Sequence, residues 1–208
     1  MPHLILVRHG KSEWNALGLW TGWTDVALAE EGVQEARAVA EALRDLDVHE
    51  VHVSTLTRAK QTFDALRSTL GWTDTLPVKT HAALNERHYG IHTGKNKWQV
   101  KEEVGEETFN NIRRGWDHPV PEGETLKDVH ARVVPYYQEE ILPTLRAGKN
   151  VMIVAHNNSL RALMKHIEDI PDEAIADVEL QTGEACCYTL DDDGRYCAQE
   201  RRYAATAG

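Results

Sequence analysis

The chain has 208 residues, of which 41% are hydrophobic and 27% are charged, and its formal net charge is −10. This composition is typical of a folded globular protein, and the length favours a single domain, which we predict to span residues 1–208. The excess of acidic residues disfavours general binding to nucleic acid, which needs a surplus of Lys and Arg. Because no apolar run approaches the roughly 20 residues of a membrane span, we expect no membrane partner.

The cysteine and histidine patterns give no sign of a disulfide framework or a metal site. Cys186, Cys187 and Cys197 make an odd number, and no C-x-x-C pair occurs. We interpret them as reduced thiols in a cytoplasmic protein. The 11 histidines show no spacing typical of metal ligands, so we predict that no metal is bound.

The first part of the chain alternates short apolar runs with helical patterns. Residues 4–7 (LILV) form a continuous apolar run that predicts a buried parallel strand. The Trp- and Gly-rich residues 10–24 predict no regular element. Helical spacing then predicts a helix over residues 29–46, and Val51 and Val53 indicate a second strand.

A second helix is predicted over residues 57–70, with Gly71 as its stop. Residues 81–123 have the least regular pattern and many polar and cationic groups. Thr125 and Asp128 resemble a capping box that opens a long helix, which Pro135 should kink or break.

The last part of the chain returns to strand patterns. Residues 151–155 (VMIVA) predict another buried strand, after which Ser159 is expected to cap a helix. Residues 185–203 predict a hairpin that turns at Asp193-Gly194. Strands that alternate with helices predict an α/β fold, a three-layer α/β/α arrangement around a mostly parallel central sheet.

Two of the predicted strands are followed by a histidine. LILV leads into Arg8 and His9, and VMIVA leads into His156. Ligands bind at the carboxyl ends of the strands in open α/β sheets, so the two imidazoles meet at one crevice if the strands are parallel neighbours. A neutral imidazole can act as a nucleophile and form a covalent intermediate. Gly10 and Gly22 would let backbone N–H groups approach an anion closely.

Several motifs in the correct order resemble one family. The chain is similar to the histidine phosphatase superfamily and, more narrowly, to the cofactor-dependent phosphoglycerate mutases. The TGW, ERHYG and RRG motifs separate the mutases from the simple phosphatases. The matching segments are RHGKSEWN (8–15), TGWTDVALAEEG (21–32), LNERHYG (84–90), RRG (113–115) and AHNNSLRAL (155–163).

The resemblance implies a role for each catalytic residue. His9 would be the nucleophile that carries a phosphoryl group as phosphohistidine. Arg8, Arg58 and His156 would surround that group and stabilise the charge on its oxygens, because phosphoryl transfer depends mainly on positioning and electrostatics. Glu86 would exchange the proton of the substrate hydroxyl.

The resemblance also implies a set of substrate-binding residues. Arginine suits the substrate carboxylate and the second phosphate because its planar guanidinium binds two oxygens at once. The implied set comprises Arg8, His9, Gly10, Lys11, Ser12, Glu13, Trp14, Asn15, Thr21, Gly22, Arg58, Glu86, Arg87, His88, Tyr89, Lys97, Arg113, Arg114, Asn157 and Asn158.

The activity implied by the resemblance is the interconversion of 3-phosphoglycerate and 2-phosphoglycerate, an isomerase reaction of glycolysis and gluconeogenesis. 2,3-Bisphosphoglycerate would be the primer and intermediate, and the partner would be a small phosphorylated carboxylic acid. We expect a monomer or a homodimer. The alternatives are a phosphatase of the same superfamily, a bisphosphoglycerate synthase, which Ser12 and Gly22 disfavour, and a non-enzymatic protein that binds phosphorylated metabolites.

Three positions depart from the usual pattern of the family. Lys11 stands where the family usually has Glu, and Asn157 stands where it usually has Gly. Ala29 replaces the Ser or Thr that usually caps the next helix, a loss that costs roughly 1 kcal/mol. The segment between Arg114 and Thr125 is also shorter than in many members.

Overall fold

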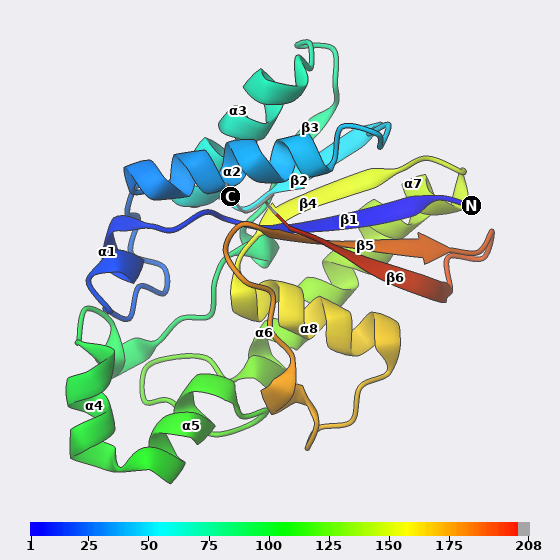
Figure 1. The fold of residues 1–208 in the computed structure, drawn as a ribbon. Helices are drawn as coiled ribbons and strands as arrows, with labels where there is room; N and C mark the ends of the chain where they lie inside the picture. The colour runs from blue at the N-terminus through cyan, green and yellow to red at the C-terminus, as the bar shows by residue number, and fades with distance from the viewer. Residues whose placement is uncertain (204–208) are drawn as a thin grey trace.

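A six-stranded sheet with the order β3-β2-β4-β1-β5-β6 forms the centre of the molecule (Figure 1). The computed structural model describes residues 1–203. Strands β1 to β4 run parallel, whereas β5 is antiparallel to β1 and β6 is antiparallel to β5. The strands are β1 (His3–Arg8), β2 (Glu50–Val53), β3 (Val78–Thr80), β4 (Val151–Ala155), β5 (Glu184–Leu190) and β6 (Tyr196–Tyr203).

Helices cover both faces of the sheet, so the predicted three-layer α/β/α fold is confirmed (Figure 1). Helices α2 (Glu30–Ala42) and α3 (Thr57–Leu70) pack on one face. Helices α6 (Leu126–Tyr136), α7 (Leu142–Arg146) and α8 (Asn157–Glu168) pack on the other. Four shorter turns complete the connections: η1 (Ala82–Leu84), η2 (Gly90–His92), η3 (Tyr137–Ile141) and η4 (Ile175–Asp177).

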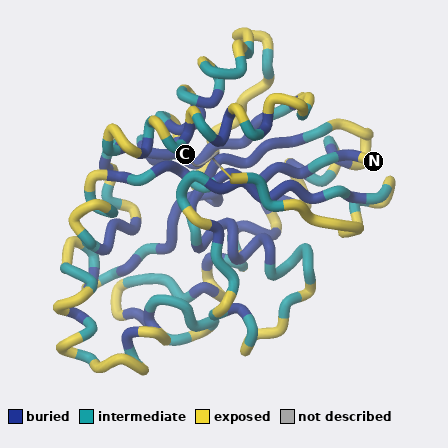
Figure 2. Tube along the Cα trace, viewed as in Figure 1, coloured by how far each residue is buried: buried dark blue, intermediate teal, exposed yellow. Residues whose placement is uncertain are grey.

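Burial on both faces explains the continuous apolar run of β1. Leu4 and Leu6 belong to the core under α6 and α8, and Ile5 and Val7 belong to the core under α2 and α3. All four side chains are fully buried, and Figure 2 shows the buried sheet between more exposed helices. A strand with two buried faces lacks the alternation of polar and apolar residues that a half-exposed strand has.

A third, smaller core lies beside the sheet, where α4 (Lys97–Val104) and α5 (Glu106–Arg114) pack around Trp20 (Figure 1). The expectation of an irregular stretch over residues 81–123 is therefore wrong for these two helices. Each is short and buries only one or two side chains, which leaves few apolar positions to indicate a helix. The short helix α1 (Glu13–Ala16) lies within residues 10–24, where no element was expected, and β3 was also missed.

The helix ends follow local chemistry that the sequence shows in part. The capping box of Thr125 and Asp128 is confirmed. Pro135 lies near the end of α6, and the chain then widens into the π-helical turn η3, as expected for a residue that lacks an N–H. Ser159 is not the cap of α8: the helix begins at Asn157, and the cap is His156, whose backbone N–H donates to the Ser159 hydroxyl.

The remaining predictions for the elements agree with the structure apart from their bounds. Helix α2 ends at Ala42, four residues before its predicted end, and its cap Ala29 makes no side-chain hydrogen bond. Gly71 ends α3 in the left-handed conformation, and β5 and β6 form the predicted hairpin. The three cysteines are free thiols. Within residues 1–203, no helix is long and apolar enough to cross a bilayer.

Candidate active site

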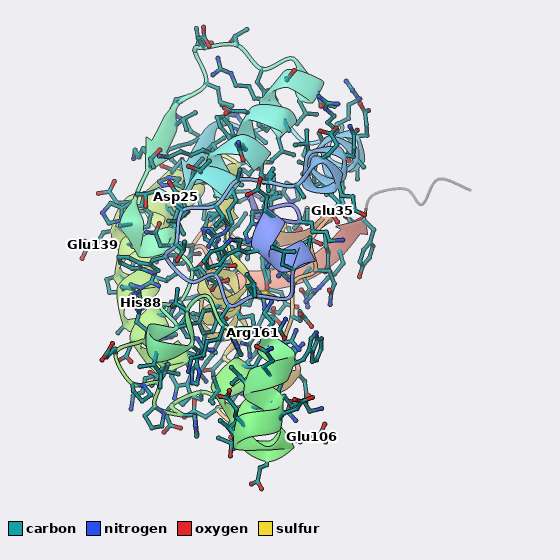
Figure 3. All side chains as sticks on the ribbon, turned by 90° about the vertical axis from the view of Figure 1, so that its left-hand side faces the viewer. Asp25, Glu35, His88, Glu106, Glu139 and Arg161 are labelled. Carbon is teal, nitrogen blue, oxygen red and sulfur yellow. The ribbon has the colours of Figure 1, made fainter. Side chains whose placement is uncertain are left out.

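The two histidines that follow β1 and β4 meet at the carboxyl end of the sheet, as predicted. The strands pair in parallel with Arg8 opposite Ala155, so the next residue of each strand enters the same space. The rings of His9 and His156 have their centroids 4.9 Å apart and are tilted by 56°. Both side chains are buried. Figure 3 faces this end of the molecule, with Arg161 of α8 and Glu106 of α5 labelled.

The hydrogen bond of His9 fixes which ring nitrogen is available for chemistry. Its Nδ1 lies 2.7 Å from the carbonyl oxygen of Gly10, which can only accept, so Nδ1 carries the hydrogen and Nε2 carries the lone pair. Burial, followed by the charges of Arg58 and Arg8, holds the pKa of His9 well below its ordinary value. The imidazole is therefore neutral at pH 7, the form that a nucleophile requires.

His156 is oriented by a hydrogen-bond chain that the sequence analysis did not single out. Its Nε2 lies 2.7 Å from the Ser54 hydroxyl, which donates its own hydrogen to the Asn85 Oδ1 at 2.9 Å. The backbone N–H of Thr55 also donates to this oxygen, which identifies it as the oxygen of the amide. His156 Nε2 must therefore donate to Ser54, and burial, with Arg58 second, lowers the pKa of His156 well below its ordinary value.

Two arginines hold backbone segments next to the histidines. Arg58 is buried and donates to the carbonyls of Gly22 at 2.7 Å and Thr24 at 3.0 Å, which fixes the loop that closes one side of the site. Burial lowers the pKa of Arg58 to about 10, so it stays charged at pH 7. Arg8 donates to the carbonyl of Leu180 at 2.8 Å.

Glu86 is fixed at the beginning of α8 by one of its two oxygens. Its Oε1 accepts from the backbone N–H of Arg87 at 2.8 Å and from the backbone N–H and side-chain amide of Asn158 at 3.2 and 3.0 Å. The same amide donates to the Tyr89 hydroxyl at 2.8 Å. These bonds hold the carboxylate in one place, as the exchange of a proton at a fixed atom requires.

A cavity of about 590 Å³, open to solvent, lies in front of these groups, and five of its side chains are cationic. It brings together most of the predicted binding residues. It is lined by Arg8, His9, Asn15, Leu19, Trp20, Thr21, Gly22, Arg58, Glu86, Tyr89, Lys97, Arg113, Arg114, Asn157, Asn158 and Glu179.

Seven predicted binding residues do not line this cavity: Gly10, Lys11, Ser12, Glu13, Trp14, Arg87 and His88. The Lys11 ammonium pairs with Glu31 of α2 at 2.7 Å, and its side chain is engaged away from the cavity. Ser12 is the buried cap of α1 and accepts from the backbone N–H of Asn15. The backbone N–H of His88 donates to Glu124.

Gly10 allows close backbone packing next to the site, and its backbone N–H is not free to bind an anion. Its backbone N–H donates to the Thr62 hydroxyl at 3.1 Å and is therefore already engaged. A Cβ at Gly10 would lie 2.1 Å from the carbonyl oxygen of Gly32, and a Cβ at Gly32 would lie equally close to the carbonyl oxygen of Lys11. The two glycines thus permit a close crossing of the loop after β1 and the first turn of α2.

Arg87 supports the wall of the cavity from behind. It is fully buried, and its guanidinium donates to the carbonyls of Ile112 and Arg113 at the end of α5. The guanidinium also lies over the ring of Tyr89, 4.7 Å from its centroid. Arg87 therefore positions Arg113 and Tyr89, which do line the cavity.

The lining includes three residues that the sequence analysis missed: Leu19, Trp20 and Glu179. Trp20 Nε1 and Thr21 Oγ1 are buried and have no hydrogen-bond partner among residues 1–203. Lys97 is partly desolvated, and this burial, followed by the charges of Arg113 and Arg8, lowers its pKa to about 8. Within the same residues, no group of three or more His, Cys, Asp or Glu side chains is placed to hold a metal.

A family model described as the histidine phosphatase superfamily (branch 1) matches residues 4–201. The chain belongs to the histidine phosphatase superfamily. Within it, the chain is 43% identical to a protein of Zymomonas mobilis named 2,3-bisphosphoglycerate-dependent phosphoglycerate mutase, over 97% of this chain and all of that one. A protein of Tropheryma whipplei with the same name is 44% identical and is matched over 93% of this chain and 96% of its own. The resemblance to the cofactor-dependent mutase family is thereby confirmed.

Solved structures share the fold at lower identity. A putative α-ribazole-5′-P phosphatase of Escherichia coli matches with a TM-score of 0.81 over the whole of both chains at 22% identity. A mycobacterial glucosyl-3-phosphoglycerate phosphatase matches with a TM-score of 0.80 over 95% of this chain and 97% of that chain at 24% identity. At these identities the similarity shows the shared histidine phosphatase fold alone.

Proposed function

We propose that this member of the superfamily is a 2,3-bisphosphoglycerate-dependent phosphoglycerate mutase that interconverts 3-phosphoglycerate and 2-phosphoglycerate. One observation carries the proposal: the neutral His9, which is backed by the buried His156, and a fixed carboxylate, Glu86, line one cavity with five cationic side chains. A simple phosphomonoester needs no second anion pocket, whereas a phosphorylated carboxylic acid does. The names of the relatives support the same activity.

The cavity lining fits a ligand with more than one anionic group. Arg8 and Arg58 lie beside His9, and Lys97, Arg113 and Arg114 supply further positive charge to the same cavity. The unpartnered Trp20 Nε1 and Thr21 Oγ1 add two hydrogen-bonding atoms. When bound, 2,3-bisphosphoglycerate supplies the phosphoryl group that primes His9.

The residues then divide the reaction between them. His9 Nε2 carries the phosphoryl group and gives it to a substrate hydroxyl, so that the P–N bond breaks and a P–O bond forms. Glu86 takes the hydroxyl proton. His9 then takes back the phosphoryl group from the other oxygen, and Glu86 returns the proton to the oxygen that is left. Arg8 and Arg58 stabilise the charge on the phosphoryl oxygens during both transfers.

An enolase-coupled assay with 3-phosphoglycerate tests the proposed function. We expect turnover that 2,3-bisphosphoglycerate stimulates, because it restores the phosphorylated form of His9. The matched control is the His9→Asn variant, which keeps a side chain of similar polarity but has no nucleophilic nitrogen. Failure to turn over 3-phosphoglycerate, together with rapid release of inorganic phosphate from a generic monoester, would indicate a phosphatase instead.

We further propose a cytoplasmic enzyme that acts as a monomer or a homodimer, in keeping with the glycolytic activity and the three free thiols. Its partner is the small phosphorylated acid itself. Nucleic acid is not expected to bind, because the net charge of −10 opposes association with phosphate polymers.

A further inference from the structure

One carboxylate stands among the cations of the cavity and has no part in the proposed transfer of the phosphoryl group. Glu179 lines the cavity, and its Oε2 accepts from Arg114 at 2.6 Å. Its Oε1 lies 3.9 Å from the guanidinium of Arg8. Both members of the Glu179–Arg114 pair are largely buried, with side-chain exposures of 22% and 28%. A negative charge at this place opposes the binding of an anion.

The backbone around Glu179 is held from three directions, so its position is built into the fold. Arg201 donates to the carbonyl of Glu179 at 2.7 Å, and Arg8 donates to the carbonyl of Leu180 at 2.8 Å. The backbone N–H of Leu180 donates to the side chain of Asn157 at 3.3 Å. Asn157, which stands where the family usually has Gly, thus ties this acidic segment to the beginning of α8.

The Glu179–Arg114 ion pair distinguishes Arg114 from the other two cations that α4 and α5 bring to the cavity. Arg114 is already engaged, since its guanidinium donates to Glu179 and, at 3.5 Å, to the carbonyl of Ala176. Lys97 and Arg113 make no ion pair within residues 1–203. The hydrogen bond and charge of Arg114 outweigh burial and hold the pKa of Glu179 below its ordinary value, so the carboxylate is ionised at pH 7.

We infer that Glu179 is a specificity-determining residue of the substrate site: it occupies Arg114 and repels the anionic end of the substrate, which is left to Lys97 and Arg113. This inference rests on the proposed function, because it concerns how the same site binds a phosphorylated carboxylate. As a consequence, the cavity binds the second anionic group of the substrate more weakly than its five cationic side chains suggest. A ligand that carries the phosphate alone is affected less, because Glu179 bonds to Arg114 and lies farther from Arg8.

The Glu179→Gln variant tests this inference, since it keeps the size and hydrogen-bonding atoms of the side chain and removes the charge. We expect its KM for 3-phosphoglycerate to fall about tenfold, the order of a partly screened interaction between charges, with a much smaller change in kcat. The Ki of glycerol 3-phosphate, which lacks the carboxylate, should fall less. The control is Glu106→Gln, which removes an equal charge from an exposed pair with Lys101 on α5.

A different result is expected if Glu179 merely holds Arg114 in a productive position. Its neutralisation would then raise the KM or leave it unchanged, and either outcome overturns the inference. If the unaltered protein shows no mutase activity, the proposed function fails separately. Titration calorimetry with 3-phosphoglycerate then decides the role of Glu179: tighter binding by Glu179→Gln supports the inference, and equal or weaker binding contradicts it.

Discussion

The chemistry of the cavity depends on keeping two imidazoles neutral beside fixed positive charges. His9 and His156 are buried next to Arg58, so protonation of either ring would place a further positive charge in a poorly solvated space. The Gly10 carbonyl then directs the lone pair of His9 to Nε2. Sequence alone places the histidines at strand ends, but the ring nitrogen that carries the lone pair follows from a hydrogen bond that only the folded chain shows.

Lys97 should make substrate binding sensitive to alkaline pH. Burial lowers its pKa to about 8 in the free protein, and a bound anion favours the charged form. The KM for 3-phosphoglycerate should therefore rise as the pH increases above 8, by up to about tenfold per pH unit if Lys97 dominates binding. Initial rates between pH 7 and 9.5 measure this. Lys97→Arg should lose the rise, and an equal rise in that variant would contradict the assignment.

Ser54 should matter to catalysis although it does not line the cavity. Its hydroxyl accepts from His156 Nε2 at 2.7 Å, so Ser54→Ala leaves that N–H unpaired and releases the ring. We expect kcat to fall about tenfold or more through misplacement of His156. Thr55→Ala is the control, because the Thr55 hydroxyl bonds to the same Asn85 oxygen at 2.7 Å but not to His156. Equal losses in the two variants would argue against a specific role for Ser54.

The elements around the site are positioned by close contacts between backbones. The loop after β1 crosses the first turn of α2 where Gly10 faces Gly32. Because His9 directly precedes Gly10, this crossing fixes the position of His9 at the end of the sheet. The helices α4 and α5 bring Lys97, Arg113 and Arg114 to the other side of the cavity. The site thus joins the main sheet to the smaller core around Trp20.

Gly32→Ala should damage both stability and activity. Its new Cβ would lie 2.1 Å from the carbonyl oxygen of Lys11. This clash is with the backbone, so it can be relieved only by a shift of the loop that carries His9. We expect the free energy of unfolding in urea to fall by about 1–3 kcal/mol, with a loss of mutase activity. The control is Gly71→Ala, whose φ of 69° strains the backbone but whose Cβ meets no atom within 4 Å, so activity should remain. A fully active Gly32→Ala would contradict this account of the crossing.

The elements also show how far the sequence predicts the fold. The apolar runs of β1 and β4, the capping box at Thr125 and the stop at Gly71 each have a strong local cause, and each is confirmed. Helices α4 and α5 were missed because their packing against Trp20 is distant in sequence. Motifs located most of the cavity lining, but Glu179 and Ser54 come from segments with no motif. The role of Lys11 was also misjudged, since Glu31 becomes its neighbour only on folding.

At the scale of the whole molecule, an acidic protein keeps a cationic cavity at the end of its sheet. The net charge is −10, yet five cationic side chains share this one cavity with two carboxylates, Glu86 and Glu179. Carbonyl oxygens hold Arg8 and Arg58, the Glu179 carboxylate holds Arg114, and α4 and α5 carry Lys97 and Arg113 to the same cavity. The single domain over residues 1–208 remains a prediction.

Stability should fall on mild acidification because the native state buries neutral histidines. The pKa values of His9 and His156 lie well below 6.5, so the unfolded chain binds more protons than the native state once the pH falls below 6.5. Each histidine should then lower the free energy of unfolding by up to about 1.4 kcal/mol per pH unit. Urea unfolding at pH 7.5, 6.5 and 5.5 measures the loss, and His156→Asn should weaken its dependence on pH. A stability that does not change over this range would contradict the neutral buried pair.

The central claim is that His9 carries the phosphoryl group on Nε2. The most direct test is ³¹P NMR of the protein after incubation with 2,3-bisphosphoglycerate, followed by peptide mapping under alkaline conditions. The account predicts one acid-labile phosphohistidine at His9, bonded through Nε2, that persists while 3-phosphoglycerate is converted to 2-phosphoglycerate, because each turnover restores it, and that is absent from His9→Asn. A phosphoryl group on another residue, or none at all while the unaltered protein turns over 3-phosphoglycerate, would contradict it.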